Sequence, residues 1–190
     1  MSRAIAVLLL MLCWAAAKAA LPETPQFRRF GFEQGLPKSV IHLAVDQQGY
    51  LWMATLDGLA RYDGVEFKMW RHAIGDAESL PDNLLQVVHV DAQNRVWVAS
   101  TSALSMLDKD RRAFRNIAFA GAAESCRRDI TALASTPEGA IWLGTYNGDL
   151  CRIDPQGRIQ RFAADTAQPD SLPAAPIMSL LIDRQGRLLI

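Results

Sequence analysis

Apolar and polar side chains alternate in short runs along this chain, and glycine-containing turns separate the runs. The clearest stretch extends from Ser39 to Asp63, where this alternation is typical of strands with two distinct faces. It predicts three strands, over Val40–Val45, Tyr50–Thr55 and Leu59–Tyr62, and a fourth over Val65–Trp70. Gly49 and Gly58 stand in the two turns, where a residue without a Cβ can adopt positive φ.

The same pattern returns along the chain at a fixed spacing. Trp52, Trp97 and Trp142 lie 45 residues apart, and a period of this length is typical of propeller blades. Three glycines close the equivalent first turn of their copies, and Asn94, a common substitute at left-handed positions, closes it in the second copy. These glycines are Gly49, Gly139 and Gly186. The chain is therefore predicted to be all-β, a partial β-propeller of four-stranded antiparallel blades.

The repeat divides the chain into about three and a half blades. The expected bounds are 39–70 for blade 1, 83–117 for blade 2, 129–163 for blade 3 and 176–190 for the start of blade 4. Propellers close with four to eight blades. We therefore expect this chain to be the front part of a longer protein.

The N-terminal residues resemble a targeting segment followed by a lone strand. Arg3 precedes an apolar run over Ala4–Ala17, and Ala17-Lys18-Ala19 fits a cleavage site, so residues 1–19 are predicted to be a signal peptide. An uncleaved anchor and a buried helix are the alternatives. Within residues 20–38 a strand is expected over Phe27–Phe32, where it would complete the last blade and close the ring.

Export changes the interpretation of two cysteines. In an oxidising compartment Cys126 and Cys151 could form a disulfide. They are expected before the first strand and in the third strand of one blade, with a middle strand between them, which is a wide gap for a disulfide. We expect two separate thiols, with a disulfide as the alternative.

Composition and motifs argue against several function classes. Lys+Arg and Asp+Glu are 20 each, so the formal net charge is zero, whereas a nucleic-acid surface would need a basic excess. The sequence has no phosphate-binding or dinucleotide glycine loop and no nucleophile elbow, and its histidines are scattered. We predict no catalytic residues, no cofactor and no metal site in this region.

The candidate binding residues lie where propellers usually meet ligands, in the turns between second and third strands and in the connections between blades. Six polar or aromatic residues are candidates: Asp57, Arg71, His72, Ser102, Tyr146 and Asn147. The repeated tryptophans could stack on sugars, but their fixed strand position favours packing between neighbouring blades. For each of the six, simple exposure to solvent is the alternative.

The phrase from Gly35 to Gly64, G-L-P-x-S-V-x-x-L-x-x-D-x-x-G-Y-L-W-M-A-T-x-D-G-L-A-R-Y-D-G, resembles the first blade of two-component regulator propellers. Val96–Ser100 and Ile141–Thr145 resemble further copies, although blade 2 has Ser102-Ala103 where blade 1 has Asp57-Gly58. This resemblance implies a periplasmic sensor region of a bacterial membrane receptor, followed by a transmembrane helix and a histidine kinase or GGDEF diguanylate cyclase output. It also implies a glycan or other small-molecule ligand, a homodimeric full-length receptor, and membrane contact only through regions beyond this chain.

The predicted function is therefore ligand sensing in the periplasm, without enzymatic activity in the region present. A secreted propeller enzyme of the lyase kind is one alternative, and it would need catalytic groups at the channel mouth. A scaffold that binds a protein partner through its rim is the other.

Overall fold

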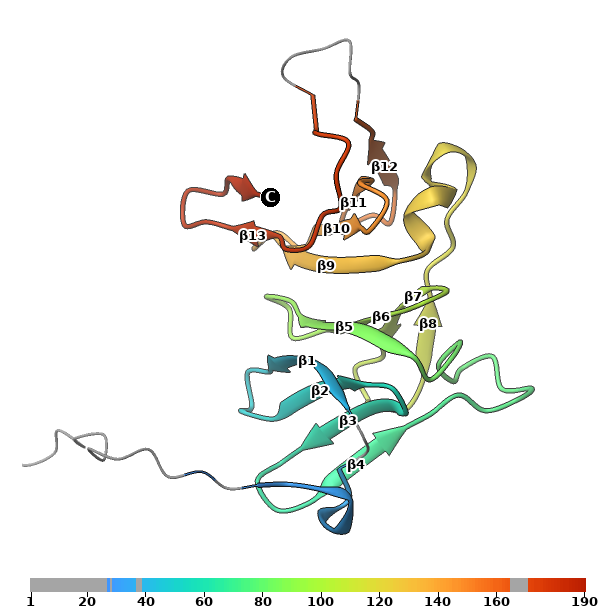
Figure 1. Cartoon of the computed structure of the whole chain (residues 1–190), viewed down its shortest axis with the longest axis vertical. Helices are drawn as coiled ribbons and strands as arrows, with labels where there is room; N and C mark the ends of the chain where they lie inside the picture. The colour runs from blue at the N-terminus through green and yellow to red at the C-terminus, as the bar shows by residue number, and fades with distance from the viewer. Residues whose placement is uncertain (1–26, 28, 37–38, 165–170) are drawn as a thin grey trace, which may run out of the picture.

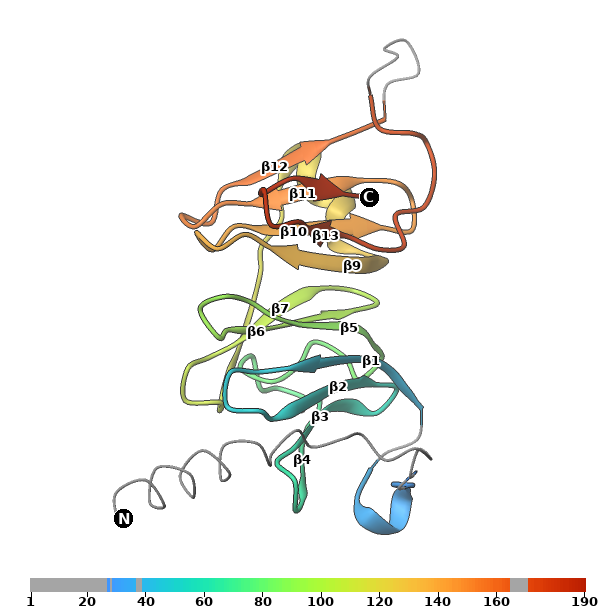
Figure 2. The same ribbon diagram turned by 90° about the vertical axis from the view of Figure 1, so that its left-hand side faces the viewer.

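Three four-stranded antiparallel sheets and one short hairpin form the body of the chain. The computed structural model describes Phe27 and residues 29–36, 39–164 and 171–190. In these residues the all-β prediction is confirmed, and each four-stranded sheet has its strands in sequence order. Figures 1 and 2 show the sheets stacked face to face in chain order, with the second sheet in the middle.

The strand bounds follow the alternation of apolar and polar residues. Blade 1 is β1 (Val40–Val45), β2 (Leu51–Thr55), β3 (Gly58–Tyr62) and β4 (Phe67–Trp70). Blade 2 is β5 (Leu85–Val90), β6 (Val96–Ser100), β7 (Leu104–Leu107) and β8 (Phe114–Asn116). Blade 3 is β9 (Ile130–Ser135), β10 (Ile141–Thr145), β11 (Leu150–Ile153) and β12 (Ile159–Phe162). The hairpin of β13 (Leu181–Ile182) and β14 (Leu188–Leu189) begins a fourth blade.

The turn between the first two strands of blade 1 is held by one aspartate. The Asp46 carboxylate accepts hydrogen bonds from the main-chain N–H groups of Gln48 and Tyr50, at 3.0 and 2.9 Å. Gly49 closes the turn with a φ of 84°, and Asn94 takes the equivalent place in blade 2 with a φ of 60°. The same local chemistry therefore makes the same turn in successive copies.

Apolar side chains fill the junctions between neighbouring blades. Trp52 lies in the cluster between blades 1 and 2, and Trp97 lies in the cluster between blades 2 and 3, where both are buried. Trp142 is half-buried at the edge of the cluster between blade 3 and the final hairpin. In the two complete junctions the indole ring of one blade is covered by the next blade.

Hydrogen bonds also join successive blades at their first turns. The Gln47 side chain donates to the Ala92 carbonyl at 2.9 Å, and the Gln93 side chain donates to the Pro137 carbonyl at 2.7 Å. Deeper in the second junction, His89 Nε2 lies 2.9 Å from the Ser135 hydroxyl. These bonds fix how each blade is rotated on its neighbour.

The strand expected over Phe27–Phe32 is wrong at its last residue, because Phe32 begins a 3-10 helix, η1 (Phe32–Gln34), and the other described residues of this segment pair with no strand of this chain. The Phe30 ring instead packs on Tyr62 and Phe67, with centroids 5.1 and 5.8 Å away. Ring closure by this segment stays a prediction. The predicted signal peptide lies outside the described residues, and no described helix has the length and apolar content to cross a membrane.

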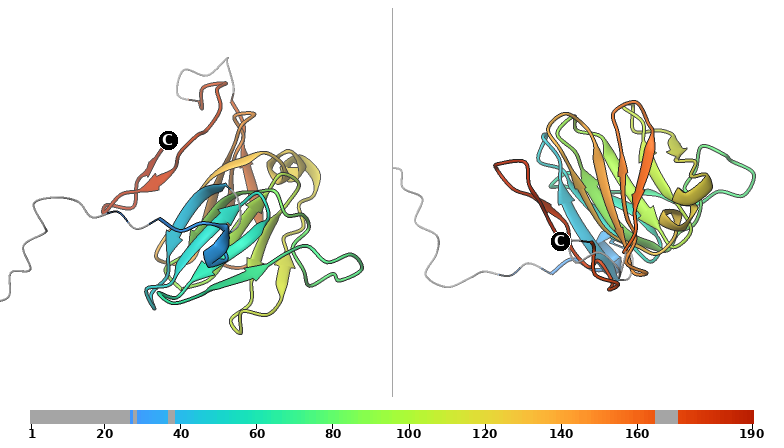
Figure 3. Two further views of the ribbon diagram at one scale, coloured as in Figure 1. Left: turned by 60° about the horizontal axis from the view of Figure 1, so that its bottom comes forward. Right: turned by 90° about the horizontal axis from the view of Figure 1, so that it is seen from above.

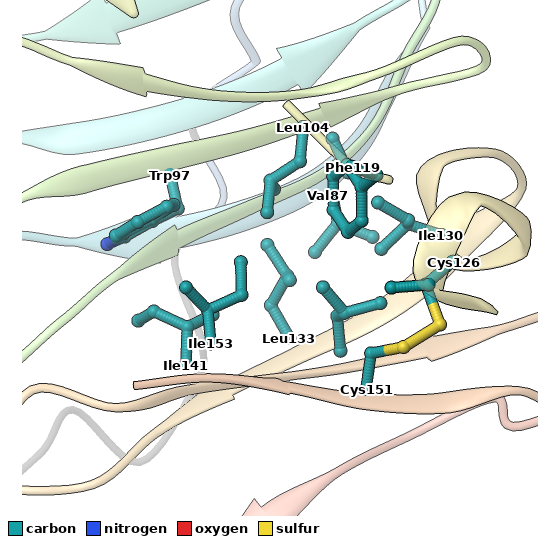
Figure 4. Packing of buried hydrophobic residues seen from close by; sticks show 13 residues of the cluster. Val87, Trp97, Leu104, Phe119, Cys126, Ile130, Leu133, Ile141, Cys151 and Ile153 are labelled. Atoms are coloured by element: carbon teal, nitrogen blue, oxygen red, sulfur yellow. A yellow bond between two sulfur atoms is a disulfide. The ribbon is translucent and has the colours of Figure 1, made fainter. Parts of the chain in front are cut away.

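The expectation of two separate thiols is also wrong, because Cys126 and Cys151 form a disulfide with their Cα atoms 6.3 Å apart. The reason is a second 3-10 helix, η2 (Gly121–Arg127), in the connection before blade 3. This helix packs against β10, β11 and β12, so that Cys126 lies over the face of the sheet rather than beyond its edge. Figure 4 shows the disulfide at one end of the cluster between blades 2 and 3.

Candidate functional site

The six candidate residues lie at the propeller end that carries the turns between second and third strands. Asp57 lies between β2 and β3, Ser102 between β6 and β7, and Tyr146 and Asn147 between β10 and β11. Arg71 and His72 follow β4 in the connection to blade 2. Antiparallel order places these turns at the end opposite Asp46 and Gly49.

In blade 1 two candidates form an ion pair. The Arg71 guanidinium donates to both oxygens of the Asp57 carboxylate, at 3.2 and 2.9 Å, and the hydrogen bond from Arg71 lowers the pKa of Asp57 below its ordinary value. Each side chain is 49% exposed, so solvent screens the pair and its contribution to stability is small, within about 1 kcal/mol. A half-exposed bidentate pair of this kind can re-pair with a polar ligand.

The connection after β4 holds His72 in place. The His72 main-chain N–H donates to the Asn83 side-chain oxygen at 2.7 Å, and its ring Nδ1 lies 2.7 Å from the Leu80 carbonyl. A carbonyl only accepts, so this contact requires a proton on Nδ1. The Gly58 N–H donates to the Asn83 carbonyl at 2.9 Å, so Asn83 joins the turn of Asp57 to the loop of His72.

Ser102 links blade 2 to both neighbouring connections. Its hydroxyl donates to the Asp82 carboxylate at 2.5 Å, and its carbonyl accepts from the Arg127 guanidinium at 3.1 Å. Asp82 and Asn83 are neighbours in sequence, so the candidates of blades 1 and 2 are connected through one dipeptide.

In blade 3 the two candidates contact Asp129. The Tyr146 main-chain N–H donates to the Asp129 carbonyl at 2.9 Å, and the Asn147 side chain lies 3.5 Å from the Asp129 carboxylate. The Tyr146 side chain is exposed, and its ring stands free for contact with a ligand body.

The structure therefore brings the candidates together in groups, each at its own blade or junction, and not in one pocket. The groups offer a guanidinium, carboxylates, a hydroxyl and a phenol, which suit the binding of a polar ligand by hydrogen bonds. Among the described residues, no group of three His, Cys, Asp or Glu side chains has a geometry that could hold a metal ion.

A cleft of about 320 Å³, which the sequence did not predict, lies at the outer edge of the second junction. It lies between blades 2 and 3 and is lined by residues of both, including Arg95, Trp97, Arg115, Ile117 and Gly157. The sequence contains one signal for this cleft, which is a difference in side-chain size between equivalent positions of successive blades. Two bulky residues of the first junction, Trp70 and Arg111, have smaller residues in the equivalent places of the second.

Comparisons with solved structures identify the fold. The chain is similar to the extracellular domain assigned to the hybrid two component system BT3049 from B. thetaiotaomicron, at 24% identity over 85% of this chain with a TM-score of 0.70. A second ectodomain, of the system BT4673 from the same organism, is 17% identical over 89% of this chain with a TM-score of 0.58. Virginiamycin B lyase from Staphylococcus aureus is 13% identical over 78% of this chain, with a TM-score of 0.59.

At these identities the comparisons establish the propeller fold. The chain spans 23% and 27% of the two ectodomains and 47% of the lyase. No protein-family model matches the sequence, and no curated protein matches it either.

Proposed function

We propose that this chain is the ligand-sensing part of an exported propeller receptor. The observation that carries the proposal is the fold similarity to two ectodomains of hybrid two-component systems, each over at least 85% of this chain. The Gly35–Gly64 phrase, which resembles two-component regulator propellers, supports the same function independently of the fold. A periplasmic location, a membrane anchor and a kinase or cyclase output belong to this proposal.

The ligand of the sensor is a glycan or a product of its breakdown. It binds at the end that carries Asp57, Arg71 and Tyr146, where an exposed phenol lies on the same face as an exposed ion pair. An aromatic ring provides a flat apolar surface for a sugar, and the charged groups provide hydrogen bonds to hydroxyl groups.

Signalling requires that the ligand prefer one of two receptor states, because a ligand shifts an equilibrium only by its difference in affinity. The candidates of each blade are hydrogen-bonded to the connections between blades. A ligand that spans two blades therefore stabilises one relative arrangement of them, and the receptor dimer transmits that arrangement to the output.

The test is calorimetric titration of the complete ectodomain with a panel of oligosaccharides. We expect one class to bind, with affinity at least tenfold weaker in Tyr146→Ala and in Asp57→Ala. Asp110→Ala is the matched control for the second variant, because Asp110 is an exposed aspartate in a turn at the other end of the propeller. Absence of heat with every glycan would count against the carbohydrate ligand.

The second candidate function is a propeller lyase, favoured by the fold similarity to virginiamycin B lyase. Incubation of the same ectodomain with cyclic depsipeptides and uronate-containing polysaccharides separates the two functions. Release of an unsaturated product, followed by its ultraviolet absorbance, would support the lyase and contradict the sensor. Unchanged substrate together with saturable binding would support the sensor.

A further inference from the structure

The outer end of the junction between blades 1 and 2 is filled by two large side chains. The Trp70 ring lies against Trp52, with centroids 5.3 Å apart, and its indole N–H donates to the Arg111 carbonyl at 3.2 Å. The Arg111 guanidinium lies 5.1 Å from the Trp52 ring centroid and donates to the Asn94 carbonyl at 3.0 Å. Side chains of this chain therefore occupy the space in front of Trp52.

Both large residues have small counterparts in the next junction. Gly157 in blade 3 is the counterpart of Arg111 in blade 2. The Gly157 N–H donates to the carbonyl of Asp154 at 2.9 Å, and the Arg111 N–H donates to the carbonyl of Asp108 at 3.2 Å, each aspartate being the first residue of its turn. Both residues have positive φ. Ile117 in blade 2 is the counterpart of Trp70 in blade 1. Trp70 is opposite Leu59 in the sheet, and the Ile117 N–H donates to the carbonyl of Leu104, which is the equivalent of Leu59 in blade 2. The cleft of about 320 Å³ lies where these two side chains are small.

The floor of the cleft is apolar and already organised. Trp97, Ile141 and Ile153 line it, and each is no more than 4% exposed. Figure 4 shows these three side chains together at the end of the cluster away from the disulfide. A rigid apolar floor with an indole ring suits the body of a compact organic molecule.

One cationic group at the wall of the cleft is uncompensated. The Arg95 guanidinium lies 5.3 Å from the Trp97 ring centroid, is neutralised by the buried Asp91 carboxylate at 2.5 Å and donates to the Gly139 carbonyl at 3.0 Å. Asp154, on the opposite wall, is paired with Arg158 at 2.6 Å. Arg115 is exposed, and within the part of the chain that the structure describes it makes no hydrogen bond or ion pair.

The strand pairing of blade 2 also places Arg115 on the wall of the cleft. It is opposite Met106, and Met106 is opposite Trp97, so the three side chains form one row across the face of blade 2 that meets blade 3. An unpaired guanidinium beside an apolar floor suits the binding of an organic acid, because the two N–H groups of Arg115 can donate to both oxygens of a carboxylate.

We infer that the cleft between blades 2 and 3 is a second binding site, for a monosaccharide-sized organic acid. The carboxylate of the acid pairs with Arg115, and its body lies against the half-buried Ile117, above the buried floor of the cleft. A volume of about 320 Å³ is at the lower limit of typical ligand pockets, which suits one sugar ring or one aromatic ring. The site runs along the outer edge of the junction between blades 2 and 3 and includes neither Asp57 nor Tyr146, and it does not depend on the proposed sensing function.

The test is calorimetric titration of the ectodomain with D-galacturonate and phenylacetate, with D-galactose as the uncharged comparison. We expect at least one of the two acids to bind, and D-galactose to bind at least tenfold more weakly than D-galacturonate if the sugar acid is the ligand. Arg115→Ala should weaken acid binding at least tenfold, and Arg115→Lys should recover part of it. Gly157→Arg copies the residue that fills the first junction and should abolish binding.

The controls separate this site from general charge effects and from misfolding. Lys109→Ala and Arg112→Ala each remove an exposed cation at the same end of blade 2 but outside the cleft. Both should bind the acid as the unmodified protein does. Far-UV circular dichroism of Gly157→Arg should be unchanged, because blade 2 accepts arginine at this position with a φ of 59°. No binding of either acid, or equal binding by the Arg115→Ala or Gly157→Arg variant, would overturn the inference.

Discussion

The Asp46 carboxylate accepts a hydrogen bond from the Trp52 indole N–H at 2.9 Å, and both residues are buried. Asp91 and Trp97 repeat this bond in blade 2 at 2.8 Å. In blade 3 the aspartate is replaced by Thr136, and Trp142 is only half-buried. The aspartate that forms the first turn of blades 1 and 2 thus also binds the buried indole of its own blade.

Asp46→Ala should lower the free energy of unfolding by about 2–4 kcal/mol, because it leaves a buried indole N–H without an acceptor and removes the carboxylate 3.7 Å from Arg111. Thr136→Ala is the matched change in blade 3, where the hydroxyl accepts a weak bond from the Ala140 N–H at 3.3 Å and otherwise hydrogen-bonds the exposed Glu138 side chain. Its cost should stay below about 1 kcal/mol. Urea unfolding measures both, and equal costs would contradict this account.

Gly58→Ala should destabilise the protein more than Gly64→Ala. Both glycines have φ near 100°, so both substitutions carry the left-handed cost of about 1–2 kcal/mol. At Gly58 the added Cβ would also lie 2.3 Å from the Trp70 carbonyl oxygen, whereas at Gly64 it meets nothing within 4 Å. The difference between the melting temperatures of the two variants therefore measures the cost of the steric clash between the start of β3 and the end of β4. Similar melting temperatures would show that the backbone moves to relieve the clash.

Replacement of both Cys126 and Cys151 by serine should reduce stability by about 3 kcal/mol, as expected for a disulfide that closes a loop of this length, with a sequence separation of 25. The loss should concentrate in η2, whose packing on blade 3 the disulfide fixes. Limited proteolysis would then cut first within residues 118–128. A variant that resists protease as well as the unmodified protein does would mean that packing alone holds the helix.

Stability should fall as the pH is lowered below about 6.5, in part because of His89. Burial lowers the pKa of His89, the nearby charge of His42 lowers it further, and Asp91 opposes both. Because its pKa is lowered, His89 stays neutral in the folded protein at a pH where it is already protonated in the unfolded chain. The unfolded chain therefore binds more protons as the pH drops, and the stability that is present above the unfolded pKa is lost.

The His89→Gln variant keeps a polar contact to Ser135 and removes the titration. Its unfolding free energy, followed from pH 8 to pH 5 by denaturant titration, should decline less than that of the unmodified protein. Parallel curves would show that other groups govern the acid response.

The strands were predictable because their signals are local and repeated. The strand over Val40–Val45 has the predicted bounds, and β2 and β3 differ from prediction by one residue at their first positions. Alternation sets the faces, and the turn aspartates and glycines set the ends.

What the sequence could not predict depends on contacts between distant segments. η2 has no helical periodicity of its own, and it forms over the strands of blade 3, which places Cys126 beside Cys151. The lone strand expected over Phe27–Phe32 needed a partner strand, and its aromatic Phe30 packs on blade 1 instead. The candidate residues were assigned to turns without knowledge of the Asp82–Asn83 and Asp129 contacts that group them.

The two complete junctions have the same turns, the same strand order and the same buried indole, yet one is filled and the other is hollow at its outer end. Figure 3 shows the sheets of the three blades lying over one another when the stack is seen from above. Two substitutions at a junction account for the difference, one at the end of a fourth strand and one in the turn before the fourth strand of the next blade. A protein built from repeated blades can thus gain a binding site at one junction while the other junctions between blades keep their original packing.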